Sequence, residues 1–335
     1  MARARFDVAT TFEVDVPPGV EVPGNETAGA FVPRRSPRYR FRKETLSDVL
    51  AWHTRGAVWG PLFLSGPTQC GKSSLMRQIA ARLNFPVQIG NGNARLEVKE
   101  LIGGFQLIGG DTLWVDGPLT TAVCLGHWFL YEEGDSVDPG ENLRLHTVLD
   151  GEPLVIAENG GEVVEPHPDF RFVLLGNTRG GGDLTGNYAG TVRQSMAFVN
   201  RFAVVEMDYP EPLHETQIVR ERVPDLSGEA VGRMVNVANA IRRLFKGEAD
   251  GDPIEVTMST GALLRWADMT WFFQGLEAHG VNPYAHALDR AMGFTAEPET
   301  RVALHEIVRA EFGEAGDIPV AGAGASAGDA SGGEP

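Results

Sequence analysis

Residues Ser65–Ser74 read S-G-P-T-Q-C-G-K-S-S and contain the spacing G-x-x-x-x-G-K-S. A loop whose backbone N–H groups all point inward must curl tightly, and Gly66 and Gly71 permit the dihedral angles that this requires. A loop of this kind opens a helix, whose N-terminal dipole also attracts anions. Lys72 adds a point charge for phosphate groups, and the Ser73 hydroxyl is a suitable ligand for Mg²⁺. The stretch therefore predicts a phosphate-binding loop.

The flanking sequence supplies the strand and the helix that such a loop needs. The run 61–64 is short and apolar, as in a buried strand, and apolar residues recur at helical spacing over 75–83. This context argues against a chance match in a chain that contains 41 glycines. We predict a P-loop nucleotide site that binds ATP and Mg²⁺. The residues expected to contact ATP are Gly66, Pro67, Thr68, Gln69, Cys70, Gly71, Lys72, Ser73 and Ser74.

Length and composition restrict the class of protein. The chain has 335 residues, enough for two domains, and no apolar run approaches the roughly 20 residues that span a bilayer. The start M-A-R-A-R-F lacks the apolar core of a signal peptide, and Cys70 and Cys124 are expected to be free thiols. A formal net charge of −16 argues against general nucleic-acid affinity, although a local patch could still bind. We therefore expect a cytoplasmic protein without a membrane partner.

A second candidate site stretch is His127–Glu133, which reads H-W-F-L-Y-E-E. An apolar strand that ends in acids is typical of P-loop proteins, in which the first acid holds the Mg²⁺ shell and the second polarises the attacking water. Glu132 takes the first position and joins Ser73 as a candidate metal ligand. Glu133 takes the second position and is the candidate catalytic base. The alternative is a pair of acids that face solvent at a strand end.

Three further apolar runs extend the predicted sheet. The runs 86–90, 170–177 and 203–207 read as strands, and Asn177 lies at the tip of the second of these. Asn177 is placed to orient the catalytic water; alternatively, it only begins the glycine-rich turn that follows. Two apolar runs around Asn159-Gly160-Gly161 predict a β-hairpin over 153–164. Residues 101–104 and 114–119 are predicted to form turns and short elements.

The remaining sequence suggests four regions. Residues 1–43 form an extended, basic segment, 44–210 the nucleotide-binding domain, 211–315 a helical lid and 316–335 a disordered tail rich in Gly, Ala and Ser. The lid helices are expected at 213–222, 228–245, 260–274, 284–292 and 298–312. The basic cluster of the first region is Arg34, Arg35, Arg38, Arg40, Arg42 and Lys43. This cluster is either a docking strip for an acidic partner or neighbouring subunit, or a solvated lead into the domain.

The order of these elements resembles that of AAA+ ATPases, within which the hairpin before the Asn177 strand resembles the pre-sensor group. Residues 33–210 further resemble the CobS-type ATPase subunit of aerobic cobaltochelatase, a MoxR/CobS-like family. The motifs that carry this resemblance are Y-R-F at 39–41, G-P-T at 66–68, L-N-F-P at 83–86, D-G-P-L at 116–119, E-P-H-P-D-F-R-F at 165–172, G-N-T at 176–178, G-D-L-T-G-N-Y-A-G-T at 182–191 and N-R-F at 200–202.

The resemblance implies a fold and a set of roles. The fold would be α/β, a P-loop AAA+ core with a parallel five-stranded sheet flanked by helices, plus a C-terminal helical lid. Asn177 would be sensor 1, and Arg201 the arginine finger that enters the neighbour's site; alternatively, Arg201 is a surface residue that caps a strand. The protein would form a homo-oligomeric ring, expected to be a hexamer, with a partner that carries a von Willebrand-type domain.

Three positions depart from the usual family pattern. Glu132 replaces an aspartate, Asn200 replaces an aspartate before the finger, and the sensor 2 arginine of many lids falls near Gly261, with Arg265 as the nearest substitute. Three functional hypotheses stay open at this point. The chain is an ATP-hydrolysing motor for metal chelation into a corrin, a MoxR-like ATPase for another client, or a scaffold that binds nucleotide and hydrolyses it poorly.

Overall fold

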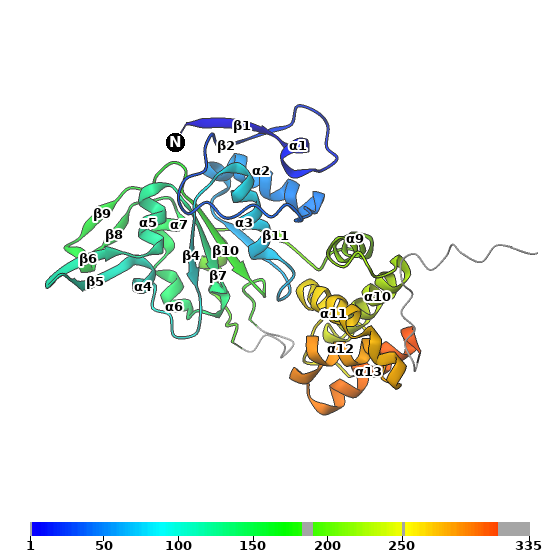
Figure 1. The fold of residues 1–335 in the computed structure, drawn as a ribbon. Coiled ribbons are helices and arrows are strands. Elements are labelled where there is room, and N and C mark those ends of the chain that lie inside the picture. Colours follow the sequence, from blue (N-terminus) through cyan, green and yellow to red (C-terminus); the bar gives the residue numbers. More distant parts are fainter. Residues whose placement is uncertain (1, 183–189, 250–251, 314–335) are drawn as a thin grey trace, which may run out of the picture. The chain divides into compact units, whose positions relative to one another are not determined.

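The computed structural model describes residues 2–182, 190–249 and 252–313, and its ribbon is drawn in Figure 1. The chain divides after Tyr209 into two compact units, Met1–Tyr209 and Pro210–Pro335. The tail predicted to be disordered over 316–335 lies outside the described residues. None of the described helices is long and apolar enough to cross a membrane.

A parallel five-stranded sheet forms the centre of the first unit, as predicted. Its strands are β3 (Leu62–Ser65), β4 (Val87–Asn91), β7 (Trp128–Glu132), β10 (Arg171–Gly176) and β11 (Ala203–Glu206). They lie in the order β11-β3-β10-β7-β4, and every neighbouring pair is parallel. Because β10 separates β3 from β7, the loops that follow these three strands emerge side by side at the carboxyl edge of the sheet, where parallel α/β sheets bind their ligands.

Both faces of this sheet are buried, which explains why its strands are continuous apolar runs rather than alternating ones. Successive side chains of a strand point to opposite faces. Leu62 and Leu64 therefore belong to one core cluster, and Phe63 belongs to the other. The same alternation divides β7 and β10 between the two clusters. The first cluster contains apolar residues of α2 (Lys43–Trp59) and α3 (Lys72–Leu83).

Short helices and turns complete the first unit around the sheet. They are α4 (Val98–Ile102), α5 (Pro118–Leu125), η1 (Gly134–Ser136), α6 (Pro139–Leu143), α7 (His146–Leu149), η2 (Ala157–Asn159) and α8 (Met196–Val199). Two antiparallel hairpins project from the same unit, β5 (Gly103–Ile108) with β6 (Asp111–Asp116), and β8 (Leu154–Ile156) with β9 (Glu162–Val164) (Figure 1). The β8–β9 hairpin has the predicted position.

The β5–β6 hairpin differs from the sequence-based prediction of turns and short elements. Gly109 and Gly110 both have positive φ angles, 64° and 99°, and they join the two strands directly. Positive φ at both central residues is the geometry of a tight two-residue hairpin turn, which glycine favours. The apolar pattern of the sequence did not predict these strands, because the hairpin has no buried face. Phe105, Leu107, Ile108 and Leu113 are all exposed, so the strands lack the alternation of apolar and polar residues that marks a half-buried strand.

The N-terminal segment, whose first 30 residues the sequence predicts to be extended or partly ordered, contains regular structure. It forms β1 (Arg3–Asp7), α1 (Val8–Phe12) and β2 (Glu21–Asn25), with β1 and β2 antiparallel. The Asp7 side chain accepts a hydrogen bond from the backbone N–H of Thr10 and so caps α1. Val8, Phe12 and Val22 join the core cluster of α2 and α3, which explains why the segment folds onto the sheet domain.

Within residues 210–249 and 252–313, the second unit contains helices and no strands. It contains α9 (Pro212–Arg222), α10 (Gly228–Phe245), α11 (Thr260–Phe272), η3 (Gln274–His279), α12 (Pro283–Ala291), η4 (Gly293–Thr295) and α13 (Pro298–Phe312). Tyr284 stacks on Phe312 with a centroid distance of 3.7 Å, and Trp266 Nε1 donates to the Tyr284 carbonyl. A buried ion pair joins Glu215 to Arg242, which also donates to the Met258 carbonyl. These contacts fix the helices of the unit to one another.

Candidate nucleotide-binding site

The phosphate-loop motif connects β3 directly to α3, as the sequence predicts. Gly71 is the residue before α3 and has a φ of 104°, a conformation that favours glycine. At Gly66, a Cβ atom would lie 1.8 Å from the Met207 carbonyl oxygen, so a larger residue cannot be accommodated without moving the backbone. Gly71 is thus favoured by its backbone conformation, and Gly66 by the close approach of its backbone to that of Met207.

The Lys72 side chain closes the loop on itself. Its Nζ donates to the carbonyl oxygens of Gly66 at 2.6 Å and Pro67 at 2.8 Å, and to Asn177 Oδ1 at 3.0 Å. Burial lowers the pKa of Lys72, and the nearby carboxylates of Asp135 and Glu133 oppose this effect. The three hydrogen bonds hold the ammonium group against the loop and beside Asn177. Asp135 and Glu133 are close enough to influence its pKa.

Contacts from distant parts of the chain brace the loop. Arg42 Nη2 donates to the Cys70 carbonyl at 3.3 Å, and the Tyr209 hydroxyl donates to the Thr68 carbonyl at 3.1 Å. The Cys70 thiol is buried and donates to the Met207 carbonyl. Burial raises the pKa of this thiol, which keeps it protonated and unreactive at neutral pH. Sequence reasoning placed Arg42 only within the basic cluster and gave no role to Tyr209.

The two acids at the carboxyl end of β7, Glu132 and Glu133, have different surroundings. Glu132 is the last residue of the strand, and its Oε1 accepts a hydrogen bond from Arg77 Nη2 of α3 at 2.5 Å. Glu133 is exposed and has a φ of 54°, so the chain turns sharply there. Because Arg77 lies on the helix that begins with the loop, the ion pair joins the acidic strand to the phosphate-loop helix. The sequence analysis did not identify Arg77.

Ser73 of α3 and Glu132 of β7 supply a hydroxyl and a carboxylate at the carboxyl edge of the sheet. The described residues contain no cluster of three or more His, Cys, Asp or Glu side chains that would hold a metal alone. Mg²⁺ in nucleotide sites needs only one or two protein oxygens, because phosphate oxygens and waters complete its octahedron. This donor set therefore fits Mg²⁺ bound together with a nucleotide.

Asn177 follows β10 and is fixed by a residue that sequence analysis missed. Asp135 is fully buried, and its Oδ2 accepts hydrogen bonds from the backbone N–H groups of Asn177 and Thr178 and from the Thr178 hydroxyl, each at 2.9 Å. The Asn177 side chain in turn contacts Lys72. In the sequence, Asp135 is recognisable only as a third acid, two residues after Glu133. Its contact with Asn177 becomes apparent only from the sheet, in which β7 and β10 are neighbours.

Arg201 lies away from this cluster. It follows α8 and precedes β11, and its Nε and Nη2 donate to the two oxygens of Asp150 at 2.8 and 3.0 Å. Its Nη1 also donates to the Ala197 carbonyl. Ala203 pairs with Leu62 in the parallel register of β11 and β3, so Arg201 lies at the amino edge of the sheet. The phosphate loop leaves β3 at the opposite, carboxyl edge.

In the second unit, the positions discussed for sensor 2 lie at the start of α11. Ser259 caps this helix through a hydrogen bond from the Ala262 N–H, and Thr260 Oγ1 donates to Glu215. Gly261 and Arg265 are both exposed on the helix. The helix start is therefore built from small and hydroxyl side chains, and Arg265 is displaced by one turn from the Gly261 position.

Comparison with known proteins agrees with this geometry. A parallel sheet with a glycine-rich loop at its carboxyl edge defines the class of P-loop nucleotide-binding proteins. Residues 61–202 match the AAA domain of the dynein-related subfamily, and residues 215–311 match the CbbQ/NirQ/NorQ C-terminal family. The chain belongs to the CobS/MoxR-like family of AAA+ ATPases, as the resemblance of its motifs predicted.

Three curated relatives illustrate the similarity. The CobS subunit of aerobic cobaltochelatase from a Sinorhizobium species is 30% identical over 80% of this chain and 81% of its own length. Protein NorQ of Paracoccus denitrificans is 31% identical over 79% of this chain and 92% of its own. Protein CbbQ of Hydrogenophilus thermoluteolus is 30% identical over 75% and 87%, respectively.

Proposed function

We propose that this chain is an ATP-hydrolysing ring motor that remodels a partner complex. The observation that carries the proposal is the convergence of Lys72, Asn177 and the β7 acids at the carboxyl edge of one sheet. Lys72 and the loop backbone bind the phosphates of ATP, and Ser73 with Glu132 holds Mg²⁺, which neutralises phosphate charge when bound. Glu133 activates the attacking water and Asn177 orients it.

The nature of the client is a second part of the proposal. Identity to the CobS, NorQ and CbbQ relatives lies between 30% and 31%, so overall similarity favours no one client. The match of residues 215–311 to the CbbQ/NirQ/NorQ C-terminal family favours a client other than a corrin chelatase. A hexameric ring and a partner with a von Willebrand-type domain complete the proposal. Mass spectrometry of proteins that co-purify with the tagged chain identifies the client, and a corrin-binding subunit among them would restore the chelatase alternative.

The proposal is tested first at Lys72. Lys72→Ala removes a charged donor from the phosphates, and such hydrogen bonds contribute about 1.5–3 kcal/mol, so the Kd for ATP should rise roughly ten- to a hundredfold. Isothermal titration calorimetry measures this change, and circular dichroism shows whether the fold persists. The matched control is Lys99→Ala, since Lys99 is an exposed lysine paired with Glu97 and distant in sequence from the loop. Unchanged affinity in Lys72→Ala would reject the loop as the ATP site.

A second prediction concerns Asp135 as the residue that positions Asn177. Asp135→Asn replaces a charged acceptor of three hydrogen bonds by a neutral amide. We expect kcat to fall about tenfold or more, with a smaller change in the KM for ATP because the Lys72 contacts to the loop carbonyls remain. If Asp135 acts through Asn177, then Asp135→Asn combined with Asn177→Ala should be no slower than Asn177→Ala alone. Multiplying effects in the double variant would contradict this role.

A further inference from the structure

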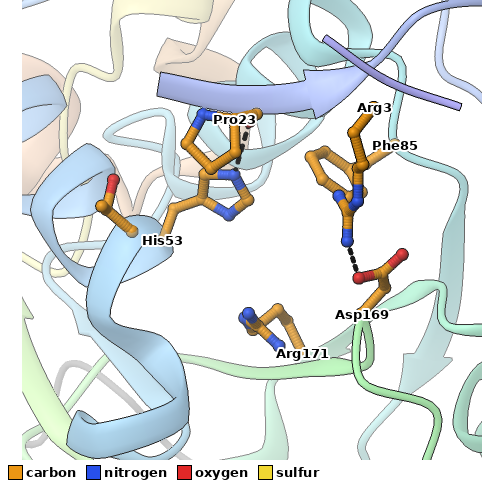
Figure 2. A pocket seen from close by; sticks show the side chains of 7 residues that line it. Arg3, Pro23, His53, Phe85, Asp169 and Arg171 are labelled. Atoms are coloured by element: carbon orange, nitrogen blue, oxygen red, sulfur yellow. Dashed lines mark hydrogen bonds and ion pairs between the residues drawn. The ribbon is translucent and has the colours of Figure 1, made fainter. Parts of the chain in front are cut away.

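A small cavity lies in the first unit, away from the phosphate loop. Its volume is about 90 Å³, and it lies between the paired strands β1 and β2, the helix α2 and the start of β10 (Figure 2). The residues that line it are Arg3, Pro23, His53, Thr54, Phe85, Asp169 and Arg171. At about 30 Å³ for each water of the liquid, the space equals roughly three water molecules. It is therefore large enough for a small polar ligand.

His53 presents an unused acceptor to this cavity. The side chain is 3% exposed, and its Nε2 lies 2.9 Å from the Pro23 carbonyl oxygen, which can only accept a hydrogen bond. Nε2 must therefore carry the hydrogen. Burial lowers the pKa of His53 to about 4, so the ring is neutral at neutral pH and Nδ1 is unprotonated. Nδ1 is buried and has no hydrogen-bond partner.

Arg171 presents an unused donor and a charge. Its Nη1 donates to the carbonyls of Pro168 and Phe170, but its Nε is buried and has no partner. Burial lowers the pKa of Arg171, and the charge of Arg3 lowers it further. Among the described residues that line the cavity, Asp169 is the only carboxylate, and it forms its ion pair with Arg3. Arg171 is half-buried, and its Nη1 contacts are to neutral carbonyl groups, so no carboxylate of the described cavity lining balances its positive charge.

We propose that this cavity is a binding site for a small oxyanion that retains an O–H group, such as hydrogen carbonate or hydrogen phosphate. One anionic oxygen accepts from Arg171 Nε and balances its charge, while the O–H group donates to His53 Nδ1. Water could satisfy both atoms but would supply no negative charge next to the buried Nε of Arg171. Sulfate has no O–H group at neutral pH and places an oxygen lone pair against Nδ1, so it should bind more weakly.

The test is calorimetric titration of the full chain with phosphate, hydrogen carbonate and sulfate at constant ionic strength in chloride. The Lys72→Ala variant is used, because phosphate could otherwise bind in the phosphate loop. We expect one site for phosphate, hydrogen carbonate or both, with at least tenfold weaker binding of sulfate. The two separate titrations show which oxyanion the site prefers. Absence of a binding heat for both hydroxylated anions, with only water in the cavity of a crystal soaked in them, overturns the proposal.

Two further variants place the binding in this cavity. Arg171→Met removes the charge and should abolish binding. His53→Phe keeps the ring contacts with Phe85 and Trp128 but removes Nδ1, so phosphate binding should fall to the level of sulfate. If Arg171→Met does not fold, Gly56→Ala replaces it, since the added Cβ would lie 2.9 Å from Arg171 Nε and displace the guanidinium. Unchanged binding in these variants would overturn the proposal.

Discussion

Arg201→Ala should bind ATP as the parent chain does and lose about 10³–10⁵-fold in hydrolysis rate, the contribution typical of arginine fingers. The reason is the position of Arg201 at the amino edge of the sheet, next to the start of β11. The loop begins after Ser65, which pairs with Glu206 at the other end of the same two strands. At about 3.3 Å per residue, four strand residues separate the two edges by roughly 13 Å. Arg201 is therefore expected to act on the phosphate of a neighbouring subunit.

Head-to-tail contacts of this kind close into rings, so hydrolysis should depend on assembly. Specific activity should rise with protein concentration as subunits associate. A mixture of Arg201→Ala and Glu133→Gln subunits should recover activity, because an intact Glu133 can then meet an intact Arg201 across an interface. The matched control is Arg5→Ala, which removes an exposed arginine whose ion pair, with Glu21, also lies in the first unit. It should hydrolyse ATP at the parental rate.

The ring hypothesis fails under a defined combination of results. If the mixture of variants stays inactive, and if the parent chain has the same specific activity at concentrations where sedimentation shows only monomer, Arg201 does not act in a neighbour's site. Arg201 would then be a surface arginine near the start of β11 whose role is limited to its bidentate contact with Asp150.

Glu133→Gln should bind ATP and stop, with a fall of about 10²–10⁴-fold in kcat, the range for loss of a general base. Glutamine keeps the shape of the side chain but cannot take a proton from water. Glu133 is exposed at the mouth of the site and is near enough to influence the pKa of Lys72. Glu132, by contrast, contacts Arg77. Rapid-quench measurement of a single turnover separates the lost chemical step from product release.

The matched control for this prediction is its neighbour. Glu132→Asp introduces the acid more common in this family, and we expect turnover to be retained or improved, with a changed Mg²⁺ concentration for half-maximal rate. Hydrolysis at the parental rate in Glu133→Gln would show that the roles of the two acids are misassigned. A scaffold that hydrolyses poorly predicts a different result, a parent chain whose turnover is already as slow as that of Glu133→Gln.

The sequence by itself determined the local architecture. The motif around Gly66, Gly71 and Lys72 specifies one backbone conformation, so it predicted strand, loop and helix together. Continuous apolar runs identified the five strands because both faces of a parallel sheet are buried. Asn177, Glu132 and Glu133 were predicted as site residues because they lie at the ends of such runs, and side chains at the carboxyl ends of parallel strands meet at one edge.

Tertiary structure alone decided which distant residues complete the site. The placement of β10 between β3 and β7 brings Asp135 to Asn177, and α3 brings Arg77 to Glu132, 55 positions apart in the chain. Arg42 and His53 acquire their partners only when the N-terminal segment folds onto the sheet domain. No local pattern encodes these pairs, because a hydrogen bond between distant segments depends on strand order and helix packing rather than on sequence spacing.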